Sequence, residues 1–478
     1  MITKHWSRAI SEPAKEFNLT KLQVIEGQIP KDLRGSLYRD GPARFERAGQ
    51  KVTHWFDGDG AILGVHFNQG EASAVYKYVK TEEFLKEEKK GKFLYNGYDF
   101  KPGLLTRLSR SSKPKNVANA SILPLPGRLV ALWDGGFPHA VHLKTLETLG
   151  LEDLSFLKKG MTYSAHPKVD PESGDIYNFG LLQNGKDFKL AMFRCNGNGQ
   201  LIKMGYGDLR NVNQIHDWVM AGRYLVVFDY ATKLSVLKYL VGGETFHEAL
   251  SWKPEIGTEI FIFDKESMSL VNHIRIKDAF YCAHFVNGYE EIDGTIYIEF
   301  IKYPDFMSFD RALQKLPSGK MDGGDMLAGK ISFMRIDPKA GKVLGANEIS
   351  HIGCEFPSVA DARIGKNWRY TLVACHSEQD GNSEGEFFRS IGRYDRQTKK
   401  MITYSFGKTR YVSEPILVSS QNDPENGYIL TVVYDAEKHK SELWIHVSYL
   451  LENGPICKIA LPGVIPPGFH GKWSSNSF

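Results

Sequence analysis

A short strand that runs into a tight polar turn is present at Val65-His66-Phe67-Asn68-Gln69-Gly70. Its apolar side chains alternate with a polar one, and the Asn-Gln-Gly that follows favours a turn because glycine accepts positive φ. The same order of an apolar pair, a polar turn and a second strand recurs six more times. These further hairpins lie at Ala140–Lys144, Ala191–Gly199, Ile260–Lys265, Ile331–Gly341, Ile391–Lys399 and Leu443–Leu451.

Seven hairpins spaced about 50 to 75 residues apart predict an all-β, seven-bladed β-propeller. This spacing exceeds the roughly 40 to 50 residues of regular propeller repeats, so we expect long loops on one face. A two-sheet sandwich or several small β domains are the alternatives that the pattern leaves open. Because no Pro/Ser-rich linker divides the chain, we expect a single domain over residues 1–478.

Short β-branched or aromatic runs that end at polar turn residues supply further strands. We expect them at Arg128–Trp133, Tyr224–Tyr230, Glu259–Asp264, Thr295–Ile301, Tyr370–Cys375, Tyr428–Tyr434 and Glu442–Val447. Helical patterns are few, and the best is Thr81–Lys90, whose mixed charges indicate a solvated surface helix.

Composition excludes several classes of protein. With 60 basic against 56 acidic residues the formal net charge is +4, so we expect no nucleic-acid partner. Five cysteines without a CxxC pair fit reduced thiols of a cytoplasmic protein. Met1–Arg8 lacks an apolar signal-peptide core and no stretch is long enough to be a transmembrane helix, so we expect a cytoplasmic location.

Histidine and glutamate recur at one phase of the hairpin repeat. His166, His216, His284 and His470 follow the last apolar residue before a hairpin turn by 21 to 25 residues, and Glu355 and Glu414 follow by 19 and 20. The innermost strands of a propeller line its central channel, so equivalent positions converge on the axis. The phase therefore predicts that four imidazoles meet there.

Four neutral imidazole nitrogens suit a first-row ion such as Fe, Zn, Cu or Ni, whereas Ca²⁺ and Mg²⁺ prefer oxygen ligands. We expect Glu355 and Glu414 to accept hydrogen bonds from the outer ring N–H of ligating histidines. The alternative for these two glutamates is a salt bridge between blades. In the Gly- and Asp-rich run His54–Gly60, we expect a tight turn in which His54 is a structural hydrogen-bond donor.

Several blocks resemble the carotenoid cleavage oxygenases. They include Arg39–Pro42, His54–Gly60, Asn116–Asn119, Ser164–Pro167, Ile215–Asp217, Ala283–Glu290, Cys354–Pro357, Ser413–Pro415 and Gly468–Gly471, which span nearly the whole chain in that family's order. The length of the chain and the general character of its sequence are closest to those of bacterial and cyanobacterial members. The resemblance implies a seven-bladed propeller capped by helices and loops, with non-haem Fe(II) on its axis.

Carried over by position, the family's iron ligands fall on the same four histidines, and its outer carboxylates fall on Glu355, Glu414 and Asp134. Related members usually carry Glu at the last position, so Asp134 reaches its histidine either directly or through a water. The implied activity is a dioxygenase that cleaves a conjugated C=C bond of a carotenoid with O₂, at the 9,10 and 9′,10′ bonds. Alternatives are an apocarotenoid 15,15′-oxygenase forming retinal, a stilbene-cleaving dioxygenase, a retinoid isomerohydrolase and a non-enzymatic binding scaffold.

Two further expectations concern a water-insoluble substrate. An aromatic-lined tunnel would select the bond by depth of insertion, and Trp133 is the candidate for its lining; the alternative is a core tryptophan between blades. Leu234, Leu237, Leu240 and Val241, interspersed with lysines, predict a monotopic patch that dips into one membrane leaflet. The alternative is that this segment packs on the protein's own surface.

Overall fold

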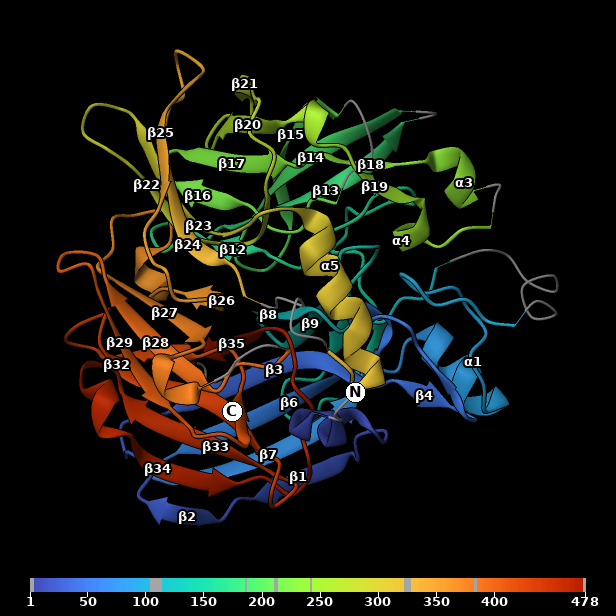
Figure 1. The fold of residues 1–478 in the computed structure, drawn as a ribbon, viewed down its shortest axis with the longest axis vertical. Coiled ribbons are helices and arrows are strands. Elements are labelled where there is room, and N and C mark those ends of the chain that lie inside the picture. Colours follow the sequence, from blue (N-terminus) through green and yellow to red (C-terminus); the bar gives the residue numbers. More distant parts are fainter. Residues whose placement is uncertain are drawn as a thin grey trace.

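The computed structural model describes residues 4–103, 114–184, 187–209, 214–240, 243–321, 328–381 and 385–475. These residues are mostly β, and their sheets stand in a propeller-like ring (Figure 1).

Five sheets of four to six strands form most of the ring. The first contains β1 (Phe17–Lys21), β3 (Gly35–Arg44), β6 (Asp59–Asn68), β7 (Glu71–Tyr78) and β35 (Gly471–Ser474). The second contains β8 (Ser121–Leu125), β9 (Arg128–Leu132), β10 (His139–Val141) and β11 (Thr148–Leu151), and the third β12 (Lys168–Val169), β13 (Ile176–Asn184), β14 (Asp187–Cys195) and β15 (Leu201–Leu209). A fourth contains β26 (Cys354–Ser358), β27 (Tyr370–Cys375), β28 (Ser390–Asp395) and β29 (Lys400–Ser405). The fifth contains β2 (Val24–Gly27), β30 (Arg410–Val412), β31 (Ile416–Ser419), β32 (Gly427–Asp435), β33 (Lys440–Val447) and β34 (Pro455–Ala460).

The sixth large sheet has eight strands in the order β21-β20-β17-β16-β22-β23-β24-β25. Its strands are β16 (Val219–Ala221), β17 (Tyr224–Asp229), β20 (Thr258–Asp264), β21 (Leu270–Ile276), β22 (Tyr281–Glu290), β23 (Ile296–Tyr303), β24 (Lys330–Asp337) and β25 (Lys342–Glu348). Two small ribbons pair β4 (Glu46–Arg47) with β5 (Gln50–Lys51) and β18 (Thr232–Leu234) with β19 (Leu250–Trp252).

The prediction of seven separate blades is therefore wrong, because eight strands join into one sheet. Strand β16 pairs with β22 in parallel through Ala221 and Gly288. A Cβ on Gly288 would lie 2.9 Å from the Ala221 Cβ and 3.1 Å from the Met220 carbonyl oxygen. The missing side chain at Gly288 is thus what lets the two strands approach closely enough to pair.

All seven predicted hairpins are confirmed. They are the strand pairs β6/β7, β10/β11, β14/β15, β20/β21, β24/β25, β28/β29 and β33/β34. Inner strands such as β22 are buried over most of their length, whereas edge strands such as β25 alternate exposed and half-buried residues. This difference follows from covering both faces of the inner strands.

Apolar clusters between successive sheets hold the ring together. One cluster joins Ile62 of the first sheet to Leu129 of the second, and another joins Val130 of the second to Phe193 of the third. The first and last sheets meet in a further cluster that contains Leu63 and Leu443. Segments from both ends of the chain close the ring, since β35 pairs with β3 and β2 pairs with β34.

Helices contribute little to the described residues. The four α-helices among them are α1 (Glu82–Lys90), α3 (Val236–Leu240), α4 (Phe246–Ala249) and α5 (Phe306–Lys315), and α5 lies across the front of the ring in Figure 1. The helix expected at Thr81–Lys90 is confirmed as α1, with the Thr81 hydroxyl accepting a hydrogen bond from the Phe84 N–H and Gly91 ending it at a φ of 64°. Its expected solvation holds only in part, because Glu83 and Glu87 are buried. The helical part of the predicted cap is therefore small.

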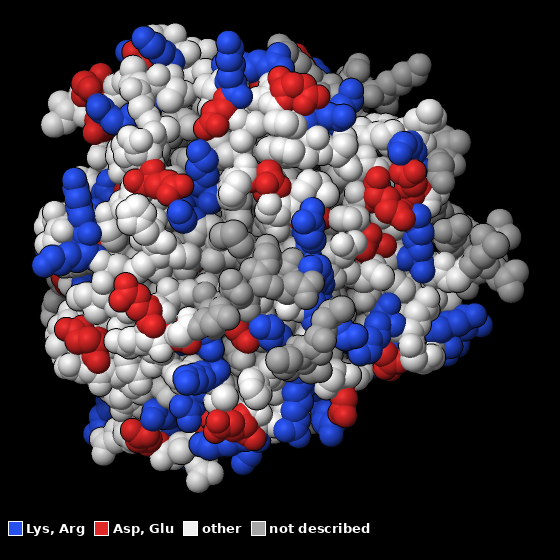
Figure 2. Space-filling model, in the orientation of Figure 1, with Lys and Arg blue, Asp and Glu red and all other residues white. Residues whose placement is uncertain are grey.

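One face of the molecule carries charges of both signs. The described Lys and Arg side chains on the face in Figure 2 stand interspersed with Asp and Glu. A polyanion approaching this face would meet attraction and repulsion side by side.

Candidate metal centre

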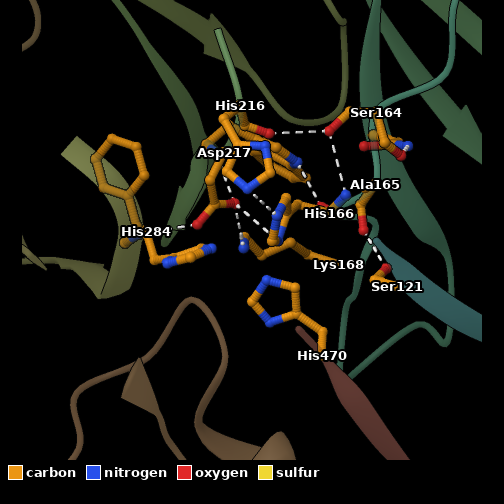
Figure 3. Close-up of polar contacts among 12 residues, drawn as sticks. Ser121, Ser164, Ala165, His166, Lys168, His216, Asp217, His284 and His470 are labelled. Atoms are coloured by element: carbon orange, nitrogen blue, oxygen red, sulfur yellow. Dashed lines mark hydrogen bonds and ion pairs between the residues drawn. The ribbon is translucent and has the colours of Figure 1, made fainter. Parts of the chain in front are cut away.

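The four phased histidines lie at the inner edge of the ring. His166, His216 and His470 come just before the inner strands β12, β16 and β35, and His284 is part of β22. Their rings point toward one another (Figure 3). One ring nitrogen from each lies within 4.8 Å of the others, so the structure places together the residues that the hairpin phase selected.

Their spacing fits a bound metal ion. Nε2 of His166 lies 2.9 Å from Nε2 of His216. Two nitrogens that each bind one ion at about 2.1 Å, at right angles, are about 3 Å apart. Nε2 of His284 is buried without a hydrogen-bond partner, and coordination to a metal ion would give this nitrogen a partner.

Carboxylates hold the opposite nitrogen of three of these rings. Nδ1 of His216 lies 2.6 Å from Asp134 Oδ2, Nδ1 of His284 lies 2.6 Å from Glu355 Oε2, and Nδ1 of His470 lies 3.1 Å from Glu414 Oε1. Each carboxylate accepts a hydrogen bond from Nδ1–H, which keeps the proton on Nδ1 and leaves the Nε2 lone pair free for a metal.

Asp134 reaches His216 directly despite its short side chain. Its second oxygen, Oδ1, accepts a hydrogen bond of 2.8 Å from the Ala165 N–H, in the segment that carries His166. One carboxylate therefore positions parts of two histidine segments.

Glu355 and Glu414 are themselves fixed. Glu355 accepts hydrogen bonds from the Tyr303 hydroxyl at 3.1 Å and from the Phe356 N–H at 2.5 Å. Glu414 accepts one of 2.6 Å from the Gly471 N–H. An Arg39 guanidinium nitrogen lies 3.7 Å from Glu414. The predicted alternative of a salt bridge thus coexists with the histidine contact at Glu414.

The electrostatics of the cluster favour neutral imidazoles at two positions. Burial lowers the pKa of His166 well below its usual value, and the other three histidines lower it further. Burial also lowers the pKa of His470, although Glu414 opposes it. His284 differs: burial lowers its pKa, but the carboxylates of Glu355, Asp217 and Glu414 together raise the pKa above its usual value. Neutral imidazole is the form that binds metal.

Two small cavities adjoin the cluster. One of about 150 Å³ is lined by His166, His284, His470, Lys168 and Asp217 among others, and a second of about 170 Å³ shares Lys168, Glu414 and Lys472 with it. Each is smaller than the roughly 300 Å³ of an ordinary ligand pocket. These spaces suit water-sized molecules.

Trp133 directly follows β9 and directly precedes Asp134, the carboxylate that contacts His216. A Cβ on Gly135 would lie 2.4 Å from its indole, so the ring packs closely over the Gly135–Gly136 backbone. The sequence-based role of Trp133 in a tunnel stays a prediction.

The proposed membrane patch is only partly on the surface. Leu237 on α3 is 72% exposed, but Leu234 is buried in β18, where it pairs with Leu250. The strand alternates, so Lys233 faces out and Leu234 faces in. Leu240 is the last residue of α3, and Val241 lies outside the described residues. Within the described part of the chain, no helix is long and apolar enough to cross a membrane.

His54 is buried in a structural network, but the hydrogen bond at its Nδ1 runs opposite to the donor role expected from the sequence. Its Nδ1 accepts a hydrogen bond of 3.1 Å from the Phe56 N–H, and its Nε2 lies 3.3 Å from Asp310 Oδ1 on α5. Asp310 also accepts from the Tyr98 hydroxyl at 2.9 Å and lies 2.6 Å from Nδ1 of His247. This buried network ties α4 and α5 to the His54 turn.

Sequence reasoning missed Asp217, Lys168 and Tyr303. Asp217 directly follows His216 in one of the recognised blocks, and Lys168 follows His166 by two residues, so adjacency to the histidines was the available signal. Tyr303 ends a strand far from Glu355 in sequence, and nothing local predicted their contact.

Comparison with known proteins identifies the family of the chain. Residues 10–475 match the RPE65 family, described as retinal pigment epithelial membrane protein. The chain belongs to the RPE65/carotenoid oxygenase family. Among curated members of this family, it is 28% identical to the apocarotenoid-15,15′-oxygenase of Synechocystis over 98% of this chain and 96% of that protein. It is also 26% identical to an isoeugenol monooxygenase of Pseudomonas nitroreducens, over 96% of this chain and 95% of that one.

Solved structures of the family give the same result. Cobalt-substituted Synechocystis ACO superimposes with a TM-score of 0.90 at 27% identity, covering 99% of this chain and 98% of that one. A metal ion can therefore be loaded into a close structural relative.

Proposed function

We propose that the protein is a non-haem Fe(II) dioxygenase that cleaves a conjugated C=C bond of a carotenoid or apocarotenoid, using O₂ to give two carbonyl products. The observation that carries the proposal is the cluster of four imidazole nitrogens within 4.8 Å of one another, backed by carboxylates on three rings. Relatives that are named oxygenases support it.

In this proposal His166, His216, His284 and His470 bind the metal. Asp134, Glu355 and Glu414 hold the rings in the correct tautomer and orientation, as outer carboxylates commonly do. These four neutral nitrogen donors would hold a ferrous ion, which would supply the electrons that activate O₂. Because the ligand set carries no thiolate and no directly coordinating carboxylate, the charge of the ion is not neutralised by its ligands.

The aromatic and apolar residues near the cluster would exclude water from an apolar alkene. Phe356 lies with its ring centroid 5.7 Å from that of His284 and 5.6 Å from that of His470. A hydrophobic wall at this distance favours a polyene over a polar substrate. Trp133, which directly precedes Asp134, stays our candidate for a tunnel lining.

We predict the 9,10 and 9′,10′ bonds as the cleavage positions. The 15,15′ bond of an apocarotenoid is the second candidate, favoured by the name of the Synechocystis relative. Relatives named isoeugenol monooxygenase and resveratrol cleavage oxygenase make a phenolic alkene the third. Their products differ in mass, so one experiment separates all three.

The test is aerobic incubation of the iron-loaded protein with β-carotene, a β-apocarotenal, isoeugenol and resveratrol under ¹⁸O₂. We expect two ¹⁸O-labelled carbonyl products from a carotenoid substrate by mass spectrometry. His284→Ala should lose iron and activity. His273→Ala, on the edge strand β21 beside Glu259, is the matched control and should keep both. Full activity in a folded, iron-free His284→Ala protein would refute the proposal.

We also propose that α3 touches one membrane leaflet, where a carotenoid would be collected. Its support is narrow: Leu237 and Val236 are exposed beside Lys238, whose ammonium could lie at headgroup level. Leu237→Ser should reduce co-sedimentation with anionic lipid vesicles, while Leu344→Ser, an exposed leucine on β25, should not. Equal sedimentation of both variants and the parent protein would contradict this proposal.

A further inference from the structure

Asp217 joins three of the four histidine segments. It is almost completely buried and directly follows His216. Its Oδ2 accepts a hydrogen bond of 2.8 Å from the Phe285 N–H, next to His284. Its Oδ1 accepts one of 2.8 Å from the Lys168 ammonium, two residues after His166 (Figure 3). The Trp218 N–H donates a third, also of 2.8 Å, to the same oxygen.

His166 differs from the other three histidines in its outer nitrogen. The carboxylates of Asp134, Glu355 and Glu414 lie within 3.1 Å of their histidines. The corresponding oxygen for His166 is Asp217 Oδ1, at 3.8 Å from Nδ1, which is beyond a hydrogen bond.

Lys168 occupies the oxygen that His166 would otherwise use. Its ammonium lies 2.8 Å from Asp217 Oδ1 and 5.8 Å from the centroid of the Trp218 ring. A charged hydrogen bond of this length in a buried place is strong, so the carboxylate stays turned toward the lysine. The main chain of His166 is held separately, by the Trp218 indole N–H on its carbonyl oxygen at 2.9 Å and by the Ser164 hydroxyl oxygen, which accepts from its N–H at 3.1 Å.

We propose that Lys168 is a positioning residue that withholds Asp217 from His166 and thereby keeps His166 the weakest donor of the four. The inference rests on the proposed metal function of the cluster. A carboxylate on the outer N–H makes an imidazole a stronger ligand, and losing or gaining such a partner changes metal affinity by about 10- to 100-fold. Lys168 thus sets an asymmetry in the centre, with one loosely held ligand and three firmly held ones.

Removing the charge of Lys168 should allow Asp217 to form a hydrogen bond with His166. Without the ammonium, Asp217 would be a buried carboxylate with one oxygen short of a charged partner, which is costly. The His166 N–H is the donor 3.8 Å away that can satisfy it. We expect Lys168→Met to convert the centre from three carboxylate-backed histidines to four.

The experiment uses the full-length protein loaded with Co²⁺, whose paramagnetically shifted ¹H NMR spectrum resolves the exchangeable N–H protons of coordinating imidazoles. In the parent protein we expect three such protons that exchange slowly with water and one that exchanges rapidly. In Lys168→Met we expect four slow protons and Co²⁺ affinity raised at least tenfold. Lys168→Arg, which keeps the charge and the hydrogen bond, should give the same spectrum as the parent protein.

Lys472→Met is the matched control. Lys472 lines the same cavity, but its ammonium lies 2.6 Å from Asp361 and not at Asp217. Its removal should leave both the spectrum and the Co²⁺ affinity unchanged. If Lys168→Met fails to fold, Lys168→Gln tests the same step with a neutral, weaker donor and should shift both readouts in the same direction.

The outcomes separate the two proposals. A parent protein that binds no Co²⁺ at the histidines would overturn the metal centre and this inference with it. Tight Co²⁺ binding in which folded Lys168→Met keeps three slow protons and the parent affinity would overturn the role of Lys168 alone.

Discussion

Replacing Glu355 probes how much an outer carboxylate contributes to metal binding. The side chain is buried, and its two oxygens serve three donors: His284 Nδ1, the Phe356 N–H and the Tyr303 hydroxyl. In Glu355→Gln the amide oxygen can still face His284 and Phe356, so the shape survives while the negative charge is lost. In Glu355→Ala all three donors lose their acceptor.

The expected magnitudes follow from these contacts. Loss of an outer partner of a metal-binding histidine weakens metal affinity by about 10- to 100-fold. At about 1.4 kcal/mol for each factor of ten, this is about 1.4 to 2.8 kcal/mol. We assign the lower end to Glu355→Gln, which keeps a neutral hydrogen bond. We assign the upper end to Glu355→Ala, which leaves the His284 ring free to turn.

The assay is competition for Fe²⁺ or Co²⁺ between the protein and a chromophoric chelator, with urea unfolding of the metal-free protein run in parallel. Glu299→Gln is the control, because Glu299 is equally buried but pairs with Arg396 at 2.7 Å, outside the histidine cluster. It should lower stability and leave metal affinity unchanged. Parent-like metal affinity in folded Glu355→Ala would refute the reasoning.

Three further predictions follow from other parts of the structure. Asp134→Ala should weaken metal binding at least tenfold by freeing the His216 ring, whereas Asp134→Glu should retain it, as chelator competition would show. Gly288→Ala should lower the free energy of unfolding in urea by about 1 to 3 kcal/mol through overpacking, while Gly345→Ala, with open space around it in the same sheet, should not. The hydrogen bond with Asp310 raises the pKa of His247. The protonated His247 therefore contributes its full stabilisation below about pH 6.5, and this stabilisation is lost as the pH rises through the raised pKa. Urea unfolding between pH 6 and 9 should show this loss in the parent protein and not in His247→Gln; an identical pH profile for the two proteins would contradict it.

Local patterns predicted the hairpins and the histidine cluster well. A hairpin is a local pattern of two alternating strands joined by a turn, so the seven hairpins could be recognised without knowing how they pack against one another. The phase of the four histidines then depended only on counting from each turn. Because inner strands of a ring face a common axis, the count was enough to bring together His166 and His470.

What the sequence did not predict depends on contacts between distant segments. The fusion of two groups of four strands into one sheet depends on the approach of Ala221 to Gly288, and a glycine in a strand has several possible causes. The burial of Leu234, which was predicted to lie in an exposed membrane patch, depends on the pairing of its strand with Leu250 on β19. The direct hydrogen bond between Asp134 and His216 depends on the position of the backbone after β9, which cannot be predicted from the length of the Asp134 side chain alone.

The closure of the ring has a consequence for how the protein is made. The strand that completes the first sheet, β35, directly follows His470, and the carbonyl oxygen of His470 accepts the Asp40 N–H at 2.8 Å. During synthesis His166, His216 and His284 leave the ribosome long before this last segment. A fourth nitrogen therefore reaches the cluster only when the ring closes, and an ion that binds all four stabilises the closed form over every open one by mass action. Metal binding would then also stabilise the pairing of β35 with β3, although neither strand contributes to the cluster anything but its neighbour His470.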